Sequence, residues 1–389
     1  MLGERIKQFR LAKGMSLDEL VASTGGIVSK VALSKYERNL IKPSNKVISS
    51  ISEALDVKIT NLVNPPSLEI EFIAYRKGSG LAKKEQLHVE NLVRTNLESR
   101  IKIQDLLFHN TKSPVPLKAF KVNTLADVET VSLDLRKHWN LGLDAIANLT
   151  YTLENNFIHV ICFQSSKHFD GISAKVYSNG ELKAAAVVSK TEISGERQRL
   201  NLAHELGHLV LDTAENVDEE KAAFRFAGAF LAPAPTVYNI AGKKREHFQL
   251  HELLLLKKTF GMSIQSLLFR LKDLEIITPS AFTTWFRIIN KNRWKKEEPY
   301  PMKEEKSNWF RGNILRAFSE GLISSEEAGK LLGEQTTSGN LSLIKKKEFM
   351  KLSIEDRNNI LSSEAKSLLN YYNSNIELKE LGEGNFADY

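Results

Sequence analysis

The motif His204-Glu205-Leu206-Gly207-His208 constrains this chain more than any other feature, because it sets two histidines four residues apart. On an α-helix such residues lie about 40° from each other around the axis, so both imidazoles project from one face. One zinc ion can take both as ligands, and Glu205 can then act as general base toward a water molecule. Apart from Glu205, residues 200–211 carry no charge, which favours a buried helix under a metal site. The alternative is an ordinary core helix with two hydrogen-bonded histidines.

A catalytic zinc needs a third protein ligand and one open position, and the next predicted helix offers a candidate. Its apolar positions follow helical spacing: Ala223, Phe226, Ala227 and Phe230. Glu220 lies one turn before the first of them, so a short connection would bring it beside His204 and His208. Asp218 and Glu219 are expected to face elsewhere and to supply the acidic first turn that a helix dipole favours. In the alternative interpretation, Glu220 is a solvated charge.

The segments RQRLNLAHELGHLVL at 197–211 and EKAAFRFAGAFLAP at 220–233 resemble the ImmA/IrrE family of zinc metallopeptidases. Residues 170–173 and 184–188 resemble the strand pair of that family, and residues 260–270 resemble its following helix pair. The resemblance extends over residues 67–300. It implies a zincin-like core in which zinc, or manganese, binds a fixed set of side chains. The implied ligands are His204, His208 and Glu220, and the implied general base is Glu205.

Two positions near this motif depart from the pattern of the family. Phe224 stands where relatives commonly carry Asn, and Ala232 replaces a usual Met before Pro233. Neither position is one of the implied ligands. The departure at Phe224 puts the hydrogen bonding around the ligands in doubt, because side chains behind the ligands orient them.

The first 66 residues carry a second, independent pattern of short helices. Residues 1–13 form a basic amphipathic segment, and Ser16 with Glu19 makes a capping box for a helix that Gly25-Gly26 ends. Ser29 then opens a third helix that runs through Arg38. LVASTGG at 20–26 and SKVALSKYERNLIKPS at 29–44 are similar to XRE/Cro-type repressors, which implies a helix-turn-helix domain.

This resemblance implies that the helix beginning at Ser29 reads DNA. The residues expected to face base edges are Ser29, Lys30, Ser34 and Lys35. Arg38 and Lys42 are expected to contact phosphates, whereas Leu33 and Tyr36 are expected in the core.

Charge favours a nucleic-acid partner for this domain. Residues 1–66 hold ten basic and six acidic side chains, and thus four of the chain's seven net positive charges. Promoter DNA is the expected partner, bound by a homodimer on two half-sites. The alternative is a helical protein-interaction module, in which Lys42 and Lys46 are solvated charges.

The chain is long enough, at 389 residues, for two or three domains with apolar cores. No apolar run reaches 18 residues and residues 1–14 are charged throughout, so neither a membrane span nor a signal peptide is expected. Cys162 is the single cysteine, which excludes an internal disulfide framework and favours a buried structural thiol. These features together predict a protein of the reducing cytoplasm.

Prolines, glycines and charge runs suggest the domain boundaries. Two prolines, Pro65 and Pro66, end the first domain, and a strand at 68–74 and a long helix near 86–108 follow. A charged, proline-bearing stretch occupies residues 295–306. The predicted parts are a helix-turn-helix domain (1–66), a spacer (67–145), a metallopeptidase domain (146–300), a helical extension (301–334), and a linker with a partner-binding segment (335–389). The predicted class is α+β and mostly helical, with a small sheet.

The last forty residues combine an amphipathic helix from residue 352 with an acidic, aromatic end. They resemble the C-terminal segment of many prokaryotic antitoxins, which implies that they order on a protein toxin, such as a nuclease. The residues expected to contact this partner are Leu361, Leu368, Leu369, Tyr371, Tyr372, Phe386 and Tyr389. The alternative is a helix that folds back on the peptidase domain.

Two functional hypotheses follow from these patterns. In the first, the chain is a DNA-binding regulator with an active zinc metalloendopeptidase that cleaves a repressor-like protein in a stress response or a toxin–antitoxin module. In the second, it is a non-proteolytic antitoxin: the metal site is structural and the C-terminal segment neutralises the toxin. The two hypotheses are compatible.

Overall fold

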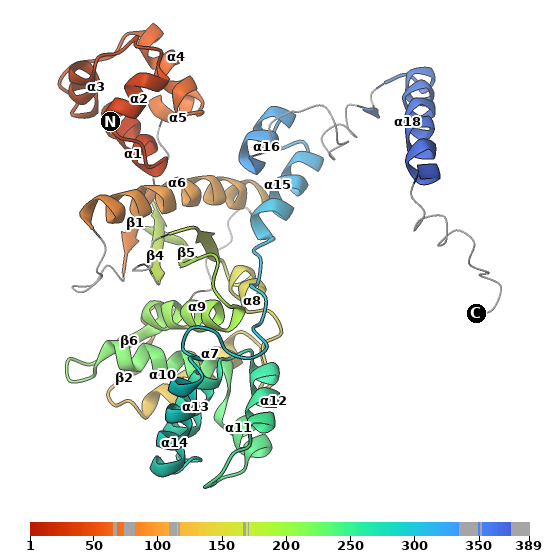
Figure 1. The fold of residues 1–389 in the computed structure, drawn as a ribbon. Helices are drawn as coiled ribbons and strands as arrows, with labels where there is room; N and C mark the ends of the chain where they lie inside the picture. The colour runs from red at the N-terminus through yellow and green to blue at the C-terminus, as the bar shows by residue number, and fades with distance from the viewer. Residues whose placement is uncertain are drawn as a thin grey trace. The chain divides into compact units, whose positions relative to one another are not determined.

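We describe the fold from a computed structural model, which covers residues 1–64, 68–73, 82–108, 115, 117–165, 169, 171–333, 349–350 and 352–374. The chain divides into two compact units, Met1–Phe310 and Arg311–Tyr389. Helices dominate both units, and the strands form one sheet of four strands and one of two in the first unit (Figure 1). The predicted α+β, mostly helical class is confirmed. No helix in the described part of the chain combines the length and apolar character of a membrane span.

The chain begins with five short helices around a small apolar core. They are α1 (Leu2–Ala12), α2 (Leu17–Ser23), α3 (Lys30–Glu37), α4 (Asn45–Ala54) and α5 (Ile59–Val63). Ile6, Leu20 and Leu33 are fully buried between them. The predicted capping box of α2 is present, since the Ser16 hydroxyl accepts a hydrogen bond from the Glu19 backbone and the Glu19 carboxylate accepts one from Ser16.

The long helix α6 (Lys83–Leu107) lies between this helical domain and the larger sheet (Figure 1). One face of α6 packs Val89, Val93 and Leu97 against the sheet. On the other side, the Arg5 guanidinium of α1 binds both carboxylate oxygens of Glu98 at 2.6 and 2.9 Å. The two domains therefore meet at a packed surface rather than only through a covalent connection.

The four-stranded sheet has the order β1-β4-β5-β3, with β4 antiparallel to both neighbours and β3 parallel to β5. Its strands are β1 (Leu68–Phe72), β3 (Ile158–Phe163), β4 (Gly171–Ser178) and β5 (Glu181–Lys190). Successive residues of a strand face opposite sides, so Ala186 and Val188 contact the α6 layer while Ala185 and Val187 join the core on the other face. The sheet is thus buried on both faces.

The second face of the sheet is covered by α9 (Gly195–Val210), which carries the two-histidine motif, and α10 (Glu219–Leu231) packs on α9. A parallel pair of short strands, β2 (Phe120–Val122) and β6 (Leu211–Thr213), lies beside them. The helices that complete the first unit are α7 (Asp127–His138), α8 (Leu149–Asn155), α11 (Ala234–Ala241), α12 (Leu250–Phe260), α13 (Ile264–Asp273) and α14 (Pro279–Lys291).

The charged, proline-bearing stretch after α14 forms neither helix nor strand, but its side chains bind other parts of the first unit. We call residues 298–307 the acidic strap, because its glutamates bind the ends of three elements of the first unit. Glu298 accepts hydrogen bonds from two backbone N–H groups at the start of α13, and Glu304 accepts one from Ile193 just before α9. Glu305 accepts one from Thr150 at the start of α8. Carboxylates at helix starts satisfy free N–H groups and favour the helix dipole.

The remaining described helices are α15 (Trp309–Ser319), α16 (Ser325–Leu332) and α18 (Ile354–Ser374). The helices predicted at 309–317, at 324–332 and from residue 352 are therefore confirmed. The predicted linker at 335–340 lies outside the described residues.

Candidate metal centre

Helices α9 and α10 bring the predicted metal ligands together. His204, His208 and Glu220 each offer one ligand atom, and these atoms all lie within 4.8 Å of one another. The Nε2 atoms of the two histidines are 3.1 Å apart, and the Glu220 carboxylate lies 3.3 Å from His204 Nε2 and 3.5 Å from His208 Nε2. This proximity was predicted from the four-residue spacing of the histidines and from the short connection between the two helices.

The close approach of the two helices depends on Gly207, the fourth residue of the motif. A Cβ atom built at Gly207 would lie 3.2 Å from the Cα atom of Ala223 and 3.2 Å from the Phe226 ring. A side chain here would push α10 away from α9, and with it Glu220 from the histidines. No pattern in the sequence pointed to this role of Gly207 other than its place between the two histidines.

The Glu205 side chain lies beside the first residue of β4. Its side chain is almost fully buried, and a Cβ atom built at Gly171 would lie 2.8 Å from its Oε1 atom. Glycine at this position therefore leaves the room that the carboxylate occupies. Glu205 directly follows His204 in the chain, and a buried carboxylate is suited to hold a proton during a reaction.

Glu219 does lie in the acidic first turn of α10, as predicted, but the expectation that it faces away from the histidines was wrong. Its Oε1 atom lies 3.4 Å from His208 Nδ1, on the side of the ring opposite the Nε2 atom that faces Glu220. Asp218 does behave as predicted, because its side chain caps α10 by accepting a hydrogen bond from the backbone of Lys221. Helical periodicity placed Glu219 off the inward face of α10, but it could not show that α9 presents His208 to that side.

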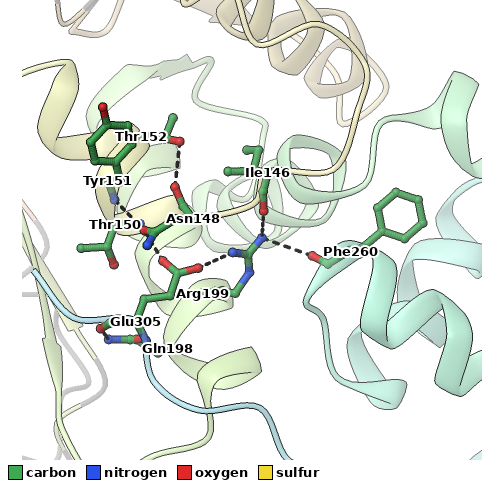
Figure 2. A network of polar contacts seen from close by, with 9 residues as sticks. All are labelled: Ile146, Asn148, Thr150, Tyr151, Thr152, Gln198, Arg199, Phe260 and Glu305. Atoms are coloured by element: carbon green, nitrogen blue, oxygen red, sulfur yellow. Dashed lines mark hydrogen bonds and ion pairs between the residues drawn. The ribbon is translucent and has the colours of Figure 1, made fainter. Parts of the chain in front are cut away.

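The start of α9 is fixed by the acidic strap (Figure 2). The Arg199 guanidinium forms an ion pair with Glu305 and donates hydrogen bonds to the backbone carbonyls of Ile146 at 2.8 Å and Phe260 at 3.3 Å. Gln198 and Glu305 exchange two hydrogen bonds between side chain and backbone, at 2.7 and 2.9 Å. The helix that carries the histidines is therefore anchored by residues from three other parts of the first unit.

The donor set fits a divalent transition metal. Two imidazoles and one carboxylate on adjacent helices leave a fourth coordination position free, which is the arrangement of a catalytic zinc site. Imidazole ligands suit zinc, and the carboxylate is compatible with zinc or manganese.

The predicted DNA-contacting residues lie on α3 and directly before and after it. Lys30, Lys35, Arg38 and Lys42 are exposed, and Lys30 pairs with Asp18 of α2 at 2.6 Å. The Ser29 hydroxyl caps α3 by accepting a hydrogen bond from Ala32, and Ser34 is half-buried.

The core prediction for α3 is confirmed, since Leu33 is fully buried and Tyr36 packs against the same cluster. Val31, which the sequence analysis did not single out, is 66% exposed in the first turn of α3. Helical periodicity could have predicted this exposure, because Val31 is two residues before the buried Leu33 and therefore lies on nearly the opposite face of the helix.

The predicted partner-binding residues are only in part described. Leu361 is exposed on α18, as are Ile354 and Ile360. Leu368, Leu369, Tyr371 and Tyr372 belong to α18, but their side chains lie outside the described part of the structure, as do Phe386 and Tyr389 entirely.

Comparison with known proteins matches two separate parts of the chain. Residues 6–62 match the helix-turn-helix family model, and residues 177–272 match that of the IrrE N-terminal-like domain, a peptidase family. The second range contains all three candidate ligands and Glu205. The HTH-type transcriptional regulators SinR of Bacillus licheniformis and of Bacillus subtilis (strain 168) are 46% and 45% identical over 65 residues. Each match covers 16% of this chain and 57% of the relative, so it supports the helix-turn-helix part alone.

Proposed function

We propose that this chain, which joins an XRE-type helix-turn-helix domain to an IrrE-like peptidase-family domain, is a DNA-binding regulator with a zinc metalloendopeptidase centre. The observation that carries the proposal is the meeting of His204, His208 and Glu220 beside the buried Glu205. The match to the helix-turn-helix family supports the DNA-binding part.

In the proposed peptide hydrolysis, the residues of the centre have two roles, metal binding and proton transfer. His204, His208 and Glu220 would hold the metal, which when bound would supply Lewis acidity toward the scissile carbonyl. Glu205 would accept a proton from the attacking water and deliver it to the leaving amine. Burial of Glu205 keeps bulk water from competing for that proton. The family resemblance implies that the substrate is a repressor-like protein.

The peptidase proposal is tested with two variants of the full chain. Glu205→Gln should keep one zinc per chain but lose cleavage of the associated protein, because an amide cannot accept the proton of water. His204→Ala should lose zinc, because one of three ligands is gone. Metal analysis and mass spectrometry of the protein that co-purifies from the native operon context measure both effects. Undiminished cleavage by Glu205→Gln would contradict its role as base.

DNA binding is tested with promoter DNA in a gel shift at two salt concentrations. Lys35→Ala should weaken specific binding by about 1–3 kcal/mol if the side chain contacts a base edge. Affinity should fall as salt rises, because basic side chains displace counterions from phosphates. The exposed Lys330 of α16 offers a control, and Lys330→Ala should leave the shift unchanged. No shift at low salt would mean that the domain binds protein instead.

The exposed apolar side chains of α18 favour a second candidate function, that of an antitoxin. Ile354 and Leu361 are 71% and 51% exposed, although an isolated amphipathic helix is marginal in water. A protein toxin encoded nearby would cover this face, and the helix would be ordered by it. Removal of residues 349–389 should then leave zinc and DNA binding intact but release the toxicity of the neighbouring gene product. Continued neutralisation by the shortened chain would contradict this function.

A further inference from the structure

Phe224 contacts the candidate metal centre although it is no ligand. It lies on α10 one turn after Glu220, so both side chains are on the same side of the helix. The centroid of its ring is 4.1 Å from that of His204, with the two planes tilted by 42°. The ring therefore lies directly against a ligand.

Among the described residues of the candidate centre, those of α10 are more exposed than those of α9. His204, His208 and Glu205 are 9%, 2% and 5% exposed, whereas Phe224 is 54% exposed and the Glu220 side chain is 46% exposed. The carboxylates of Glu219 and Glu220 and the ring of Phe224 are thus the α10 groups that solvent reaches beside the two histidines. Of these three, the Phe224 ring alone offers an apolar surface to a molecule that approaches His204.

A half-exposed aromatic ring at this position favours bound molecules that place an apolar side chain on it. An apolar side chain that packs on the ring removes apolar area from water on both surfaces, whereas a polar or absent side chain gains nothing there. Because about half of Phe224 is exposed to solvent, its side chain is not part of the packed core.

We infer that Phe224 is a specificity-determining residue that makes the centre prefer peptides with an apolar side chain next to the carbonyl at the metal. The inference rests on the proposed metallopeptidase function and names the substrate class of the same site.

Two small probes that differ in one side chain test this inference without a known substrate. They are N-acetyl-L-leucine hydroxamate and N-acetylglycine hydroxamate, titrated calorimetrically into the zinc-loaded full chain. The leucine compound should bind about tenfold more tightly, because a site that packs an extra apolar group discriminates by about that factor or more. In Phe224→Ala this ratio should fall to about one while the glycine compound binds as before. Phe224→Leu should keep most of the preference.

A matched control is Phe269→Ala, which removes another half-exposed phenylalanine, on α13, and should leave the ratio at about ten. Zinc stoichiometry distinguishes specificity from a structural role. If Phe224 merely braces His204, Phe224→Ala should lose zinc or weaken both compounds equally, and either result would overturn the inference. Equal affinities in the unaltered chain would overturn the inference alone. Failure of the zinc-loaded chain to bind either compound would overturn the proposed function with it.

Discussion

At the scale of single residues, both ring nitrogens of His208 have carboxylates beside them. Nε2 faces Glu220, and Nδ1 lies 3.4 Å from Glu219, whose carboxylate is also 3.6 Å from Lys118 Nζ. A proton on Nδ1, directed at Glu219, would leave the lone pair of Nε2 for a metal. Glu219 would thereby orient the candidate ligand His208.

We predict that Glu219→Gln lowers zinc affinity by about 10- to 100-fold, as the loss of a group behind a metal-binding histidine does elsewhere. Competition with a fluorescent zinc chelator measures the affinity. Asp218→Asn is the control, because this neighbouring residue caps α10 and contacts no ligand in the described contacts; it should change the affinity little. Equal affinities of Glu219→Gln and the unaltered chain would contradict the prediction.

His159 illustrates a second effect at this scale, the burial of a titratable group. Its Nε2 atom is 3.0 Å from Gln104 Oε1, and its ring meets the edge of Trp309. Burial lowers the pKa of His159 well below its usual value, and the nearby charge of Arg100 acts in the same direction. The folded chain therefore binds a proton here less readily than the unfolded chain.

We predict that the free energy of unfolding falls as the pH is lowered from about 7.5 to 5, with His159 contributing to the loss. Above the unfolded pKa of about 6.5 neither state carries this proton; below it the unfolded state takes it up, which costs up to about 1.4 kcal/mol per pH unit. Urea titrations of the metal-free chain and of metal-free His159→Gln over this range measure how steeply the free energy of unfolding changes with pH. The variant should show the smaller change, and identical changes would contradict the contribution assigned to His159.

At the scale of elements, the end of α10 is held by two buried arginines. Arg136 donates a hydrogen bond to the carbonyl of Phe230 at 2.5 Å, and Arg270 donates one to that of Ala232 at 2.9 Å. These carbonyls lack partners within the helix, so the arginines act as C-terminal caps. Burial lowers the pKa of Arg136 to about 10, which leaves it charged at neutral pH. The helix that carries Glu220 is thus fixed at the end remote from the metal centre.

We predict that Arg270→Ala lowers the free energy of unfolding by about 3 kcal/mol, because it removes the bidentate partner of Glu129 from a buried site. Burial raises the pKa of Glu129, but the two neighbouring guanidinium groups outweigh it and hold that pKa below its usual value. The matched control is Arg225→Ala. Arg225 also pairs with Glu129, at 3.2 Å, but it is more exposed and should cost about 1 kcal/mol. Urea unfolding measures both losses, and equal losses would contradict the larger contribution assigned to the buried Arg270–Glu129 pair.

At the scale of the first unit, the helix-turn-helix domain is docked on α6 by polar contacts. The Arg5 and Glu98 side chains are 7% and 13% exposed, and Gln8 donates a further hydrogen bond to Glu98 at 3.0 Å. At the other end of α1, His88 Nδ1 lies 2.7 Å from the carbonyl oxygen of Leu11. Because α6 also packs on the sheet, this surface joins the helix-turn-helix domain to the body that carries the metal centre.

We predict that Glu98→Ala weakens this docking by about 3 kcal/mol, because Arg5 stays buried without its carboxylate. Hydrogen exchange should become faster in α1 and along the facing side of α6, while zinc content stays at one per chain. Asp18→Ala is the control, since it breaks the exposed pair with Lys30 and should cost below about 1 kcal/mol. Unchanged exchange in α1 would show that apolar packing alone holds the two domains together.

Much of this organisation could be predicted from the sequence because it follows from local rules. Helical spacing placed His204 and His208 on one face, the apolar stripe placed Glu220 on the inward face of α10, and the capping box set the start of α2. These patterns depend on residues within a few positions of each other, so they can be recognised in the sequence alone.

The tertiary structure decided what depends on residues far apart in the chain. Only packing showed that Gly207 lets α10 approach, that Glu219 meets His208, and that Phe224 lies on His204. The sequence did not show the role of the acidic strap, because Glu304 and Glu305 bind N–H groups more than a hundred positions away, those of Ile193 and Thr150. No local pattern encodes such partners. The sequence by itself therefore determined the candidate ligands, and the packing of helices determined what surrounds them.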